Sequence, residues 1–316
     1  SKKVFTLSGD NKVNKDLIFP YGYELIIEPG TTIEINKGKS IVTYGDVLVR
    51  GSSKRRVVIR SATNEPFGVF AAIGDSKSNI DIKYLDISNG SEAIINGSYI
   101  SGALSFYNHK LVTINNSNIF SNVADDGLNI KKSSIVLTNN YFYNNFADNV
   151  DLDVCIGVIS DNIFENKVLP QGAKKSKIFD INGDGIDLSG SDITLYRNIL
   201  KGFPDKGISI GEASNVVIFD NDFIENNSAI TVKDGSKAYL ISNKYDNNNI
   251  NIDSYVKKPI FPPPSIYSYN EKHGDDVKLG RGSEYYFSEK SLEPSQLEYL
   301  NIFKYLNTKV QWILKK

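Results

Sequence analysis

The sequence of 316 residues has a single cysteine, no methionine and a formal net charge of only −1. The lone Cys155 excludes an intramolecular disulfide and a zinc site built from cysteines, but it leaves the redox compartment open. No segment approaches the roughly 18 consecutive apolar residues of a membrane span. The basic residues are scattered, so no global field exists to hold nucleic acid phosphates. These absences predict a soluble, folded protein with no membrane span and no nucleic acid partner.

Motifs for nucleophilic, phosphate or dinucleotide chemistry are absent as well. We find no Gly-x-Ser-x-Gly, Walker-type or dinucleotide-binding glycine pattern. The two histidines, His109 and His273, are far apart, and neither has the spacing of metal ligands. We therefore expect both histidines to be structural or exposed.

Asparagine is the residue in excess: the chain contains 34 of them. Asparagines that precede apolar residues recur at spacings of 22, 22, 36, 23 and 22 residues. These positions are Asn118, Asn140, Asn162, Asn198, Asn221 and Asn243. We expect one such residue in each repeat to lie at a tight turn near the left-handed region, with the stacked amides hydrogen-bonded from repeat to repeat. Turn chemistry explains them better than ligand binding does.

Within each repeat, short apolar runs or alternating residues are separated by polar turns, which indicates strands and no helical period. An all-strand repeat of about 22 residues predicts a parallel β-helix, because a propeller blade needs about 40 residues. Less regular coils begin near Leu25, and Asp86 is a candidate for the asparagine column. The longer interval contains the segment Lys167–Lys177, which we interpret as a loop projecting from the solenoid, with function or simple connection equally compatible.

The repeats are predicted to stop after Tyr255, where Lys257, Lys258 and a run of prolines follow. Ser295 and Glu298 have the spacing of a capping box. A helical stripe then follows at Leu297, Leu300, Phe303, Leu306 and Val310. We therefore divide the chain into residues 1–255, a parallel β-helix, and residues 256–316, an irregular or helical cap that covers the end of the solenoid.

In one strand of each repeat, a polar residue directly follows the inward-facing apolar side chain. Stacked from repeat to repeat, these polar residues form a column that faces solvent. That column is Asn129, Asp151, Asp187, Ser209, Thr231 and Asn251. A second column, two positions before the inward residue, is Asp126, Asp148, Asp184, Lys206 and Ser228. If the long interval preserves the pairing, Asp151 and Asp187 are neighbours in adjacent coils about 4.8 Å apart.

Carboxylates this close repel one another, so ionising all of them costs free energy. The cluster therefore needs a shared proton, a bound cation or a nearby lysine. Aspartate is disfavoured at outward strand positions, so turn preference does not explain the whole cluster. Solvated surface aspartates are the alternative interpretation. Asp153 lies two residues beyond Asp151, and Lys131, Lys206 and Lys233 flank the cluster, where they suit a substrate carboxylate or sulfate.

The motif Asn182–Asp187, followed one coil later by Asp205-Lys206-Gly207, resembles the polygalacturonases and the wider pectin-lyase-like superfamily of right-handed parallel β-helices. The resemblance covers about residues 25–255. It implies a catalytic carboxylate at Asp184 and a second at Asp205, where this chain has Lys206 in place of the aspartate that completes the family's pair. It also implies a polysaccharide or glycan as substrate.

Together these features predict an all-β, single-stranded, right-handed parallel β-helix acting on a polysaccharide outside the cell or at its surface. Catalysis is assigned to Asp151, Asp184, Asp187 and Asp205, with hydrolysis as the reaction. Substrate binding is assigned to Asp148, Asp153, Lys131, Lys206 and Lys233. No cofactor is required for hydrolysis, whereas a lyase variant would combine the lysines with calcium. The alternative is a non-catalytic carbohydrate-binding, structural or adhesive β-helix.

Overall fold

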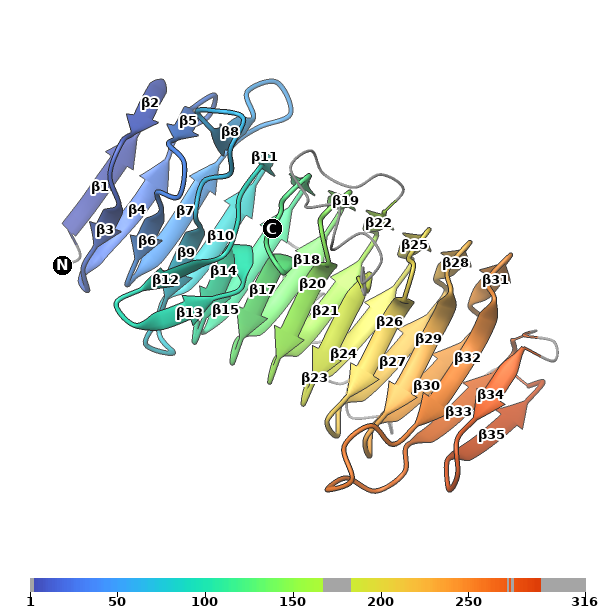
Figure 1. Ribbon diagram of the computed structural model, residues 1–316. Helices are drawn as coiled ribbons and strands as arrows, with labels where there is room; N and C mark the ends of the chain where they lie inside the picture. Colours follow the sequence, from blue (N-terminus) through green and yellow to red (C-terminus); the bar gives the residue numbers. More distant parts are fainter. Residues whose placement is uncertain (1–2, 167–182, 272, 274–275, 291–316) are drawn as a thin grey trace.

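The computed structural model describes residues 3–166, 183–271, 273 and 276–290. Within these residues the chain winds through three long parallel sheets of 12, 10 and 11 strands (Figure 1). Up to β32 successive turns of the solenoid add a strand to each sheet, and after β31 the described chain extends only the sheets of 12 and 11 strands. The all-β parallel solenoid predicted from the repeat is confirmed. The described residues contain no helix long and apolar enough to cross a membrane.

Sheet A runs along the whole described solenoid. Its strands are β1 (Lys3–Leu7), β4 (Tyr23–Ile27), β7 (Asp46–Arg50), β10 (Asn79–Lys83), β15 (Leu111–Asn115), β18 (Ser134–Thr138), β21 (Ile156–Ser160), β24 (Asp192–Tyr196), β27 (Asn215–Phe219), β30 (Lys237–Ile241), β33 (Ser265–Tyr269) and β35 (Glu284–Ser288).

Sheet B consists of shorter strands. They are β2 (Asp10–Val13), β5 (Thr32–Ile35), β8 (Val57–Ser61), β11 (Leu85–Ser88), β16 (Asn118–Phe120), β19 (Tyr141–Tyr143), β22 (Ile163–Glu165), β25 (Ile199–Lys201), β28 (Asp222–Ile224) and β31 (Lys244–Asp246).

Sheet C carries the polar columns that the sequence singled out. Its strands are β3 (Leu17–Phe19), β6 (Ile41–Thr43), β9 (Phe70–Ile73), β14 (Gly102–Tyr107), β17 (Asp126–Lys131), β20 (Asp148–Asp153), β23 (Ile186–Ser189), β26 (Lys206–Gly211), β29 (Ser228–Lys233), β32 (Ile250–Tyr255) and β34 (Val277–Leu279). An antiparallel hairpin, β12 (Ala93–Ile95) and β13 (Ser98–Ile100), is inserted before β14.

One continuous apolar core fills the solenoid from Leu7 to Ile266. Inward side chains stack from coil to coil, as in the Phe142 and Phe164 rings, whose centroids lie 4.9 Å apart. Stacking of like side chains at one position follows from the parallel, in-register pairing of the strands. The core therefore holds the three sheets at fixed positions and presents their outer faces to solvent.

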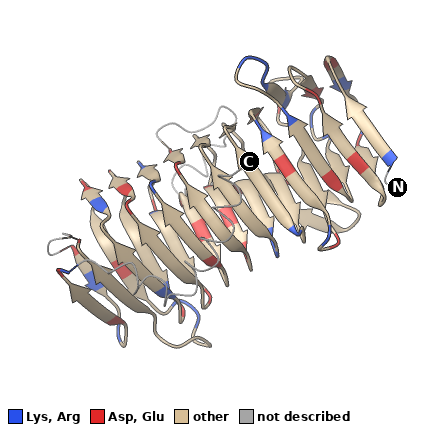
Figure 2. Ribbon diagram, turned by 180° about the vertical axis from the view of Figure 1, so that it is seen from behind, with Lys and Arg blue, Asp and Glu red and all other residues tan. Residues whose placement is uncertain are grey.

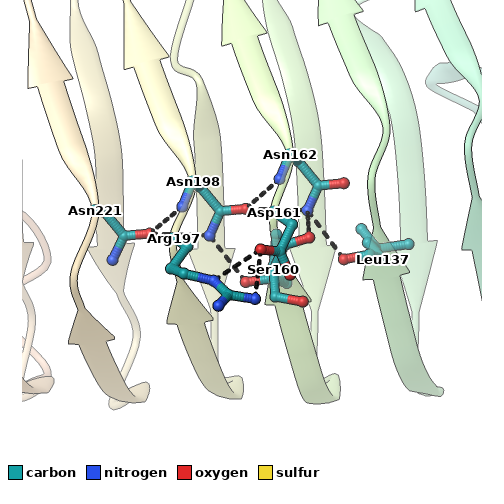
Figure 3. Close-up of polar contacts among 8 residues, drawn as sticks. Leu137, Ser160, Asp161, Asn162, Arg197, Asn198 and Asn221 are labelled. Carbon is teal, nitrogen blue, oxygen red and sulfur yellow. Dashed lines mark hydrogen bonds and ion pairs between the residues drawn. The ribbon is translucent and has the colours of Figure 1, made fainter. Parts of the chain in front are cut away.

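Asparagines form a buried ladder at one corner of the solenoid (Figure 3). The backbone N–H and the Nδ2 atom of Asn162 both donate to Asn198 Oδ1 at 3.0 Å, and those of Asn198 donate to Asn221 Oδ1 at 2.8 and 2.9 Å. The ladder runs from Asn140 to Asn243, which donates to the buried Glu271 carboxylate. The predicted hydrogen bonding of stacked amides is thus confirmed.

Three details of the asparagine prediction were wrong. Asn118 pairs with Tyr141 and Asp86, so Ser117 takes the ladder position in its coil. Asp86 is likewise outside the ladder. The left-handed backbone position is the residue before each ladder asparagine, such as Arg197 with φ of 51°. The amide therefore serves to hydrogen-bond the next coil rather than to relieve backbone strain.

Parallel pairing continues past the predicted boundary at residue 255. Strand β33 pairs with β30, β34 with β32 and β35 with β33. The division into residues 1–255 and 256–316 stays a prediction, and the predicted capping helix lies outside the described residues. The predicted loop Lys167–Lys177 also lies outside them.

Candidate active site

The outer face of sheet C brings together the carboxylates of three consecutive coils. Asp151 of β20 pairs in register with Asn129 of β17 on one side and with Asp187 of β23 on the other. The long interval between β22 and β23 therefore leaves the register intact, which is the condition under which the sequence made Asp151 and Asp187 neighbours. In Figure 2 acidic residues recur on neighbouring strands in the middle of the solenoid. We call this surface the acidic face: Asp126, Asp148, Asp151, Asp153, Asp184 and Asp187, with the neighbouring Lys131, Lys206 and Lys233.

The same pairing corrects one predicted position in the outward column. Ile230 pairs with Ile252, and Thr231 pairs with Asp253. Asp253 lies 22 residues after Thr231 and therefore stands where the sequence predicted Asn251, which lies only 20 residues after Thr231 and was assigned two positions out of the repeat.

Asp148, Asp184 and Asp187 form the tightest group. Each offers one carboxylate oxygen, and these oxygens all lie within 4.8 Å of one another. Asp148 Oδ1 accepts a hydrogen bond from the backbone N–H of Asp184 at 2.6 Å. This hydrogen bond holds the segment that leads into β23 against β20 of the preceding coil. It places the Asp148 and Asp184 side chains beside each other.

Burial and mutual repulsion make these carboxyls hard to ionise. Burial raises the pKa of Asp184 to about 7, an effect that the nearby Lys206 charge opposes. Burial also raises the pKa of Asp151 to about 9, and the charges of Asp126 and Asp153 add to that rise. For Asp148, burial and the Asp184 charge hold the pKa well above its usual range. The face therefore contains protonated carboxyls near neutral pH.

Each lysine of the face has a different partner. Lys206 Nζ lies 3.5 Å from Asp184 Oδ1 and also contacts the Asp205 carboxylate. Lys131 forms an ion pair with Asp153 at 2.7 Å. These two lysines neutralise carboxylates at the two ends of the acidic face.

Lys233 is the most buried of the three lysines, with 7% of its surface exposed. Its Nζ donates to the Ser209 hydroxyl at 2.6 Å, and Ser209 pairs in register with Asp187. Within the described part of the chain, no carboxylate lies in ion-pair distance of Lys233.

The acidic group fits a hard cation as well as a proton. Calcium takes carboxylate oxygens at about 2.3–2.6 Å, so oxygens within 4.8 Å of one another can share one ion. Asp148, Asp184 and Asp187 would hold it, and burial would favour it because the ion neutralises carboxylates that repel each other. The donor set is therefore compatible with the calcium considered from the sequence.

Three further features lie at this site. Asn129, from the predicted outward column, donates from Nδ2 to Asp151 Oδ2 at 2.7 Å. Asp126, from the predicted second column, is 4% exposed, and burial raises the pKa of its carboxyl to about 7. Its backbone N–H donates to the carbonyl of Ser101, the residue that follows the hairpin β12–β13, at 3.3 Å. The columns had placed Asn129 and Asp126 on this face without a role, whereas the hairpin carried no repeat signal.

Both histidines are structural. His109 and His273 are 2% and 5% exposed and lie outside the acidic face. His109 hydrogen-bonds Ser78 Oγ at 2.9 Å, and His273 Nε2 hydrogen-bonds Ser268 Oγ at 2.9 Å. The prediction from their spacing is confirmed.

Comparison with known proteins identifies the fold. Neither a family model nor a curated protein sequence matches this chain. Among solved structures it is similar to tailspike protein 2 from the Escherichia coli O157:H7 bacteriophage CAB120, at 14% identity, with a TM-score of 0.50 and 91% of this chain covered. The chain has a pectin-lyase-like parallel β-helix fold. This β-helix spans 42% of the length of that tailspike protein.

Two further solved structures are similar to this β-helix at lower scores. Pectate lyase Pel9A is 13% identical, with a TM-score of 0.43, and the match covers 92% of this chain and 83% of the lyase. An alginate lyase from Paenibacillus sp. str. FPU-7 is 13% identical, with a TM-score of 0.32, over 84% of this chain and 93% of that one. At these identities the likeness concerns the fold, and the chemistry has to be argued from the acidic face.

Proposed function

We propose that the protein is a polysaccharide-cleaving enzyme, a glycoside hydrolase whose reaction centre is Asp184 and Asp187. The observation that carries this proposal is the approach of their carboxylate oxygens to within 4.8 Å on an outward sheet face, with the pKa of Asp184 raised to about 7. Paired carboxyls in different protonation states are what glycosidic cleavage needs. A polymer of sugars as substrate places the protein outside the cell or at its surface.

In this mechanism Asp184 is the general acid. Its proton passes to the glycosidic oxygen as the bond from that oxygen to the anomeric carbon breaks, and Asp187 attacks the anomeric carbon. Water then releases the sugar from Asp187, with Asp184 as base. The upper limit of 4.8 Å on the distance between their nearest oxygens lies below the roughly 6.5–9.5 Å that separates the carboxyl groups of inverting enzymes, which need room for a water molecule. We therefore expect retention of configuration.

The other predicted residues have supporting roles. Asp148 positions Asp184 through the hydrogen bond to its backbone N–H. Lys206 is held between Asp184 and Asp205, so Asp205 positions the lysine rather than acting on substrate. Asp151 lies beside Asp187 in the neighbouring coil, where a protonated carboxyl can donate a hydrogen bond to a sugar hydroxyl.

Elimination is the second candidate reaction, and the buried Lys233 favours it. Lys233 would take the C5 proton of a uronate while the C4–oxygen bond breaks, leaving a C4–C5 double bond, and water would protonate the departing oxygen. Calcium held by Asp148, Asp184 and Asp187 would supply the charge that neutralises the uronate carboxylate. Lys233 would be the base because it alone of the three lysines has no carboxylate partner among the described residues.

A panel of polysaccharides, with calcium or with a chelator, tests the proposal. New reducing ends without absorbance from unsaturated products, independent of calcium, are the expected result for a hydrolase. Calcium-dependent absorbance identifies the elimination reaction instead. If the folded protein binds a polymer without cleaving any member of the panel, the proposal is wrong and the non-catalytic carbohydrate-binding β-helix replaces it.

Replacing Lys206 by Gln is expected to move the alkaline limb of the pH–activity profile upward by roughly one pH unit. The Lys206 charge lowers the pKa of Asp184, so its removal lets Asp184 keep its proton to higher pH. The measurement is kcat/KM against pH for this variant and for Lys237→Gln, an exposed lysine on sheet A. A limb that stays in place or moves downward contradicts the role of Asp184 as acid.

A further inference from the structure

The hairpin β12–β13 is anchored on the outer face of sheet C, on the N-terminal side of the acidic face. Its inner side packs in one apolar cluster with side chains from and next to β6 and β9; the cluster is Val42, Val69, Ala71, Ile95 and Ile100. At the tip, Asn96 and Gly97 have φ of 51° and 79°, as in a two-residue type I′ turn. Asn96 Nδ2 donates to Tyr44 Oη at 2.9 Å. The hairpin is therefore held along its inner side and at its tip.

The other side of the hairpin presents large apolar side chains to solvent. Ile94 and Tyr99 are cross-strand partners and are 72% and 58% exposed. Tyr21 is 63% exposed, and its ring centroid lies 5.2 Å from that of Tyr44, the residue that the hairpin tip contacts. We call Tyr21, Tyr44, Ile94 and Tyr99 the tyrosine patch. Exposed apolar side chains scattered singly are ordinary, whereas a group of them joined by contacts marks a binding surface.

The tyrosine patch stands in line with the proposed reaction centre. Val42, which the hairpin covers, begins an outward column of sheet C that ends at Asp187. In order of pairing, the column is Val42, Ala71, Ser105, Asn129, Asp151 and Asp187. These five steps between coils span about 24 Å at the usual distance between strands. A chain molecule that lies along the outer face of sheet C from Asp187 therefore reaches the patch.

The side chains of the patch suit sugars that carry no charge. The segments that form it, residues 17–23, 41–45 and 93–101, contain no charged residue. A tyrosine ring offers its face to the C–H groups of a sugar, and its hydroxyl bonds to sugar hydroxyls. Tyr44 Oη accepts from Asn96 and still has its own O–H to donate. Because the hairpin is already anchored, little conformational freedom is lost when a ligand binds.

We propose that the tyrosine patch is a second glycan-binding site, which takes uncharged sugar rings of the polymer that is cleaved at Asp184 and Asp187. A disaccharide is too short to span the roughly 24 Å between the two sites, whereas a polymer occupies both. The patch therefore favours long chains: it lowers KM without acting on the bond that breaks. The inference rests on the proposed function for the identity of the polymer.

Affinity electrophoresis on native gels tests the inference. Separate gels contain galactomannan, xyloglucan, mixed-linkage β-glucan or dextran, which are uncharged, and one contains polygalacturonate. All proteins carry Asp187→Asn, so that turnover does not consume the polymer. We expect at least one uncharged polymer to retard the parent, and the double variant Tyr21→Ala/Tyr99→Ala to bind it at least about tenfold more weakly, because two ring contacts are lost. Tyr286→Ala, which removes a 54% exposed tyrosine from sheet A, is the matched control and should bind like the parent.

Binding by the double variant that equals the parent's overturns the inference, as does equal weakening by Tyr286→Ala. Retardation by polygalacturonate alone, or by no polymer, also overturns it. Both tyrosines are exposed, so the circular dichroism of the double variant should match the parent; if it does not, Tyr99→Ser replaces it, with an expected loss of about threefold. Sedimentation velocity covers the remaining occupant: a parent that dimerises, with a monomeric double variant that binds glycan unchanged, shows an interface between two copies and rejects the glycan site.

Failure of this inference is separate from failure of the proposed function. Cleavage of a polymer with the same KM for the unaltered chain and for Tyr21→Ala/Tyr99→Ala leaves the enzyme proposal standing and removes the inference. Binding that depends on Tyr21 and Tyr99, by a protein that cleaves no polymer, does the reverse.

Discussion

Replacing Asp187 by Asn is expected to lower kcat on the susceptible polysaccharide by about 10²–10⁴-fold, because the carboxylate that attacks the anomeric carbon is lost. The amide has nearly the same shape, and Asp187 makes no hydrogen bond or ion pair with other described residues that folding would lose. The free energy of unfolding is therefore expected to stay the same or rise, since one of three crowded carboxylates is removed. Steady-state kinetics and urea unfolding on the same preparation measure the two effects.

The matched control for this variant is Asp81→Asn on sheet A, which removes an exposed carboxylate far from the acidic face and should leave kcat unchanged. If Asp187→Asn retains more than about a tenth of the parent rate while remaining folded, Asp187 is not the nucleophile. Activity restored by added azide or formate in Asp187→Asn would support the nucleophilic role independently.

Replacing Asn198 by Leu is expected to lower the free energy of unfolding by about 3–5 kcal/mol. Asn198 accepts from the backbone N–H and Nδ2 of Asn162, and its Nδ2 donates to Asn221 Oδ1 and to Ile159 O at 2.8 Å (Figure 3). Leucine has a similar volume but no polar atom, so it leaves these buried groups without partners. Urea unfolding followed by circular dichroism measures the loss.

The control for the ladder is Asn215→Leu, an exposed asparagine at the start of β27 in the same sequence repeat. It is expected to change the free energy of unfolding by less than about 0.5 kcal/mol. Equal losses for Asn198→Leu and Asn215→Leu would mean that the ladder contributes little and that the stacked apolar core alone holds the coils together.

The alternation of apolar and polar residues predicted which side chain of each strand faces the core, so the columns containing Asp151 and Asp187 were found before the structure. The failures have two causes: a coil of 23 residues from Ser117 to Asn140 displaced Asn118 from the ladder, and Asn251 was assigned although the regular 22-residue spacing leads from Thr231 to Asp253. Repeat spacing fixes an average coil, whereas pairing in each coil depends on its own turn length.

In the candidate active site, too, some residues were predicted from the sequence and others were not. Asp184 and Lys206 were found through a motif, and their contact at 3.5 Å agrees with their neighbouring positions in adjacent coils. The hairpin β12–β13 carries no repeat signal, so the packing of its Ile95 and Ile100 on Val42, Val69 and Ala71 had no sequence counterpart.

The sequence by itself determined the architecture: a 22-residue period of strands, inward apolar columns and outward carboxylates predicts a parallel β-helix because strand direction and side-chain alternation are local properties. The tertiary structure decided the chemistry. Burial raises the pKa of Asp151 and Asp184, and Asp126 Oδ2 lacks a donor, because residues from other coils and from the hairpin surround them. Desolvation and charge–charge interactions depend on distances between such segments, and these distances exist only once the chain has folded.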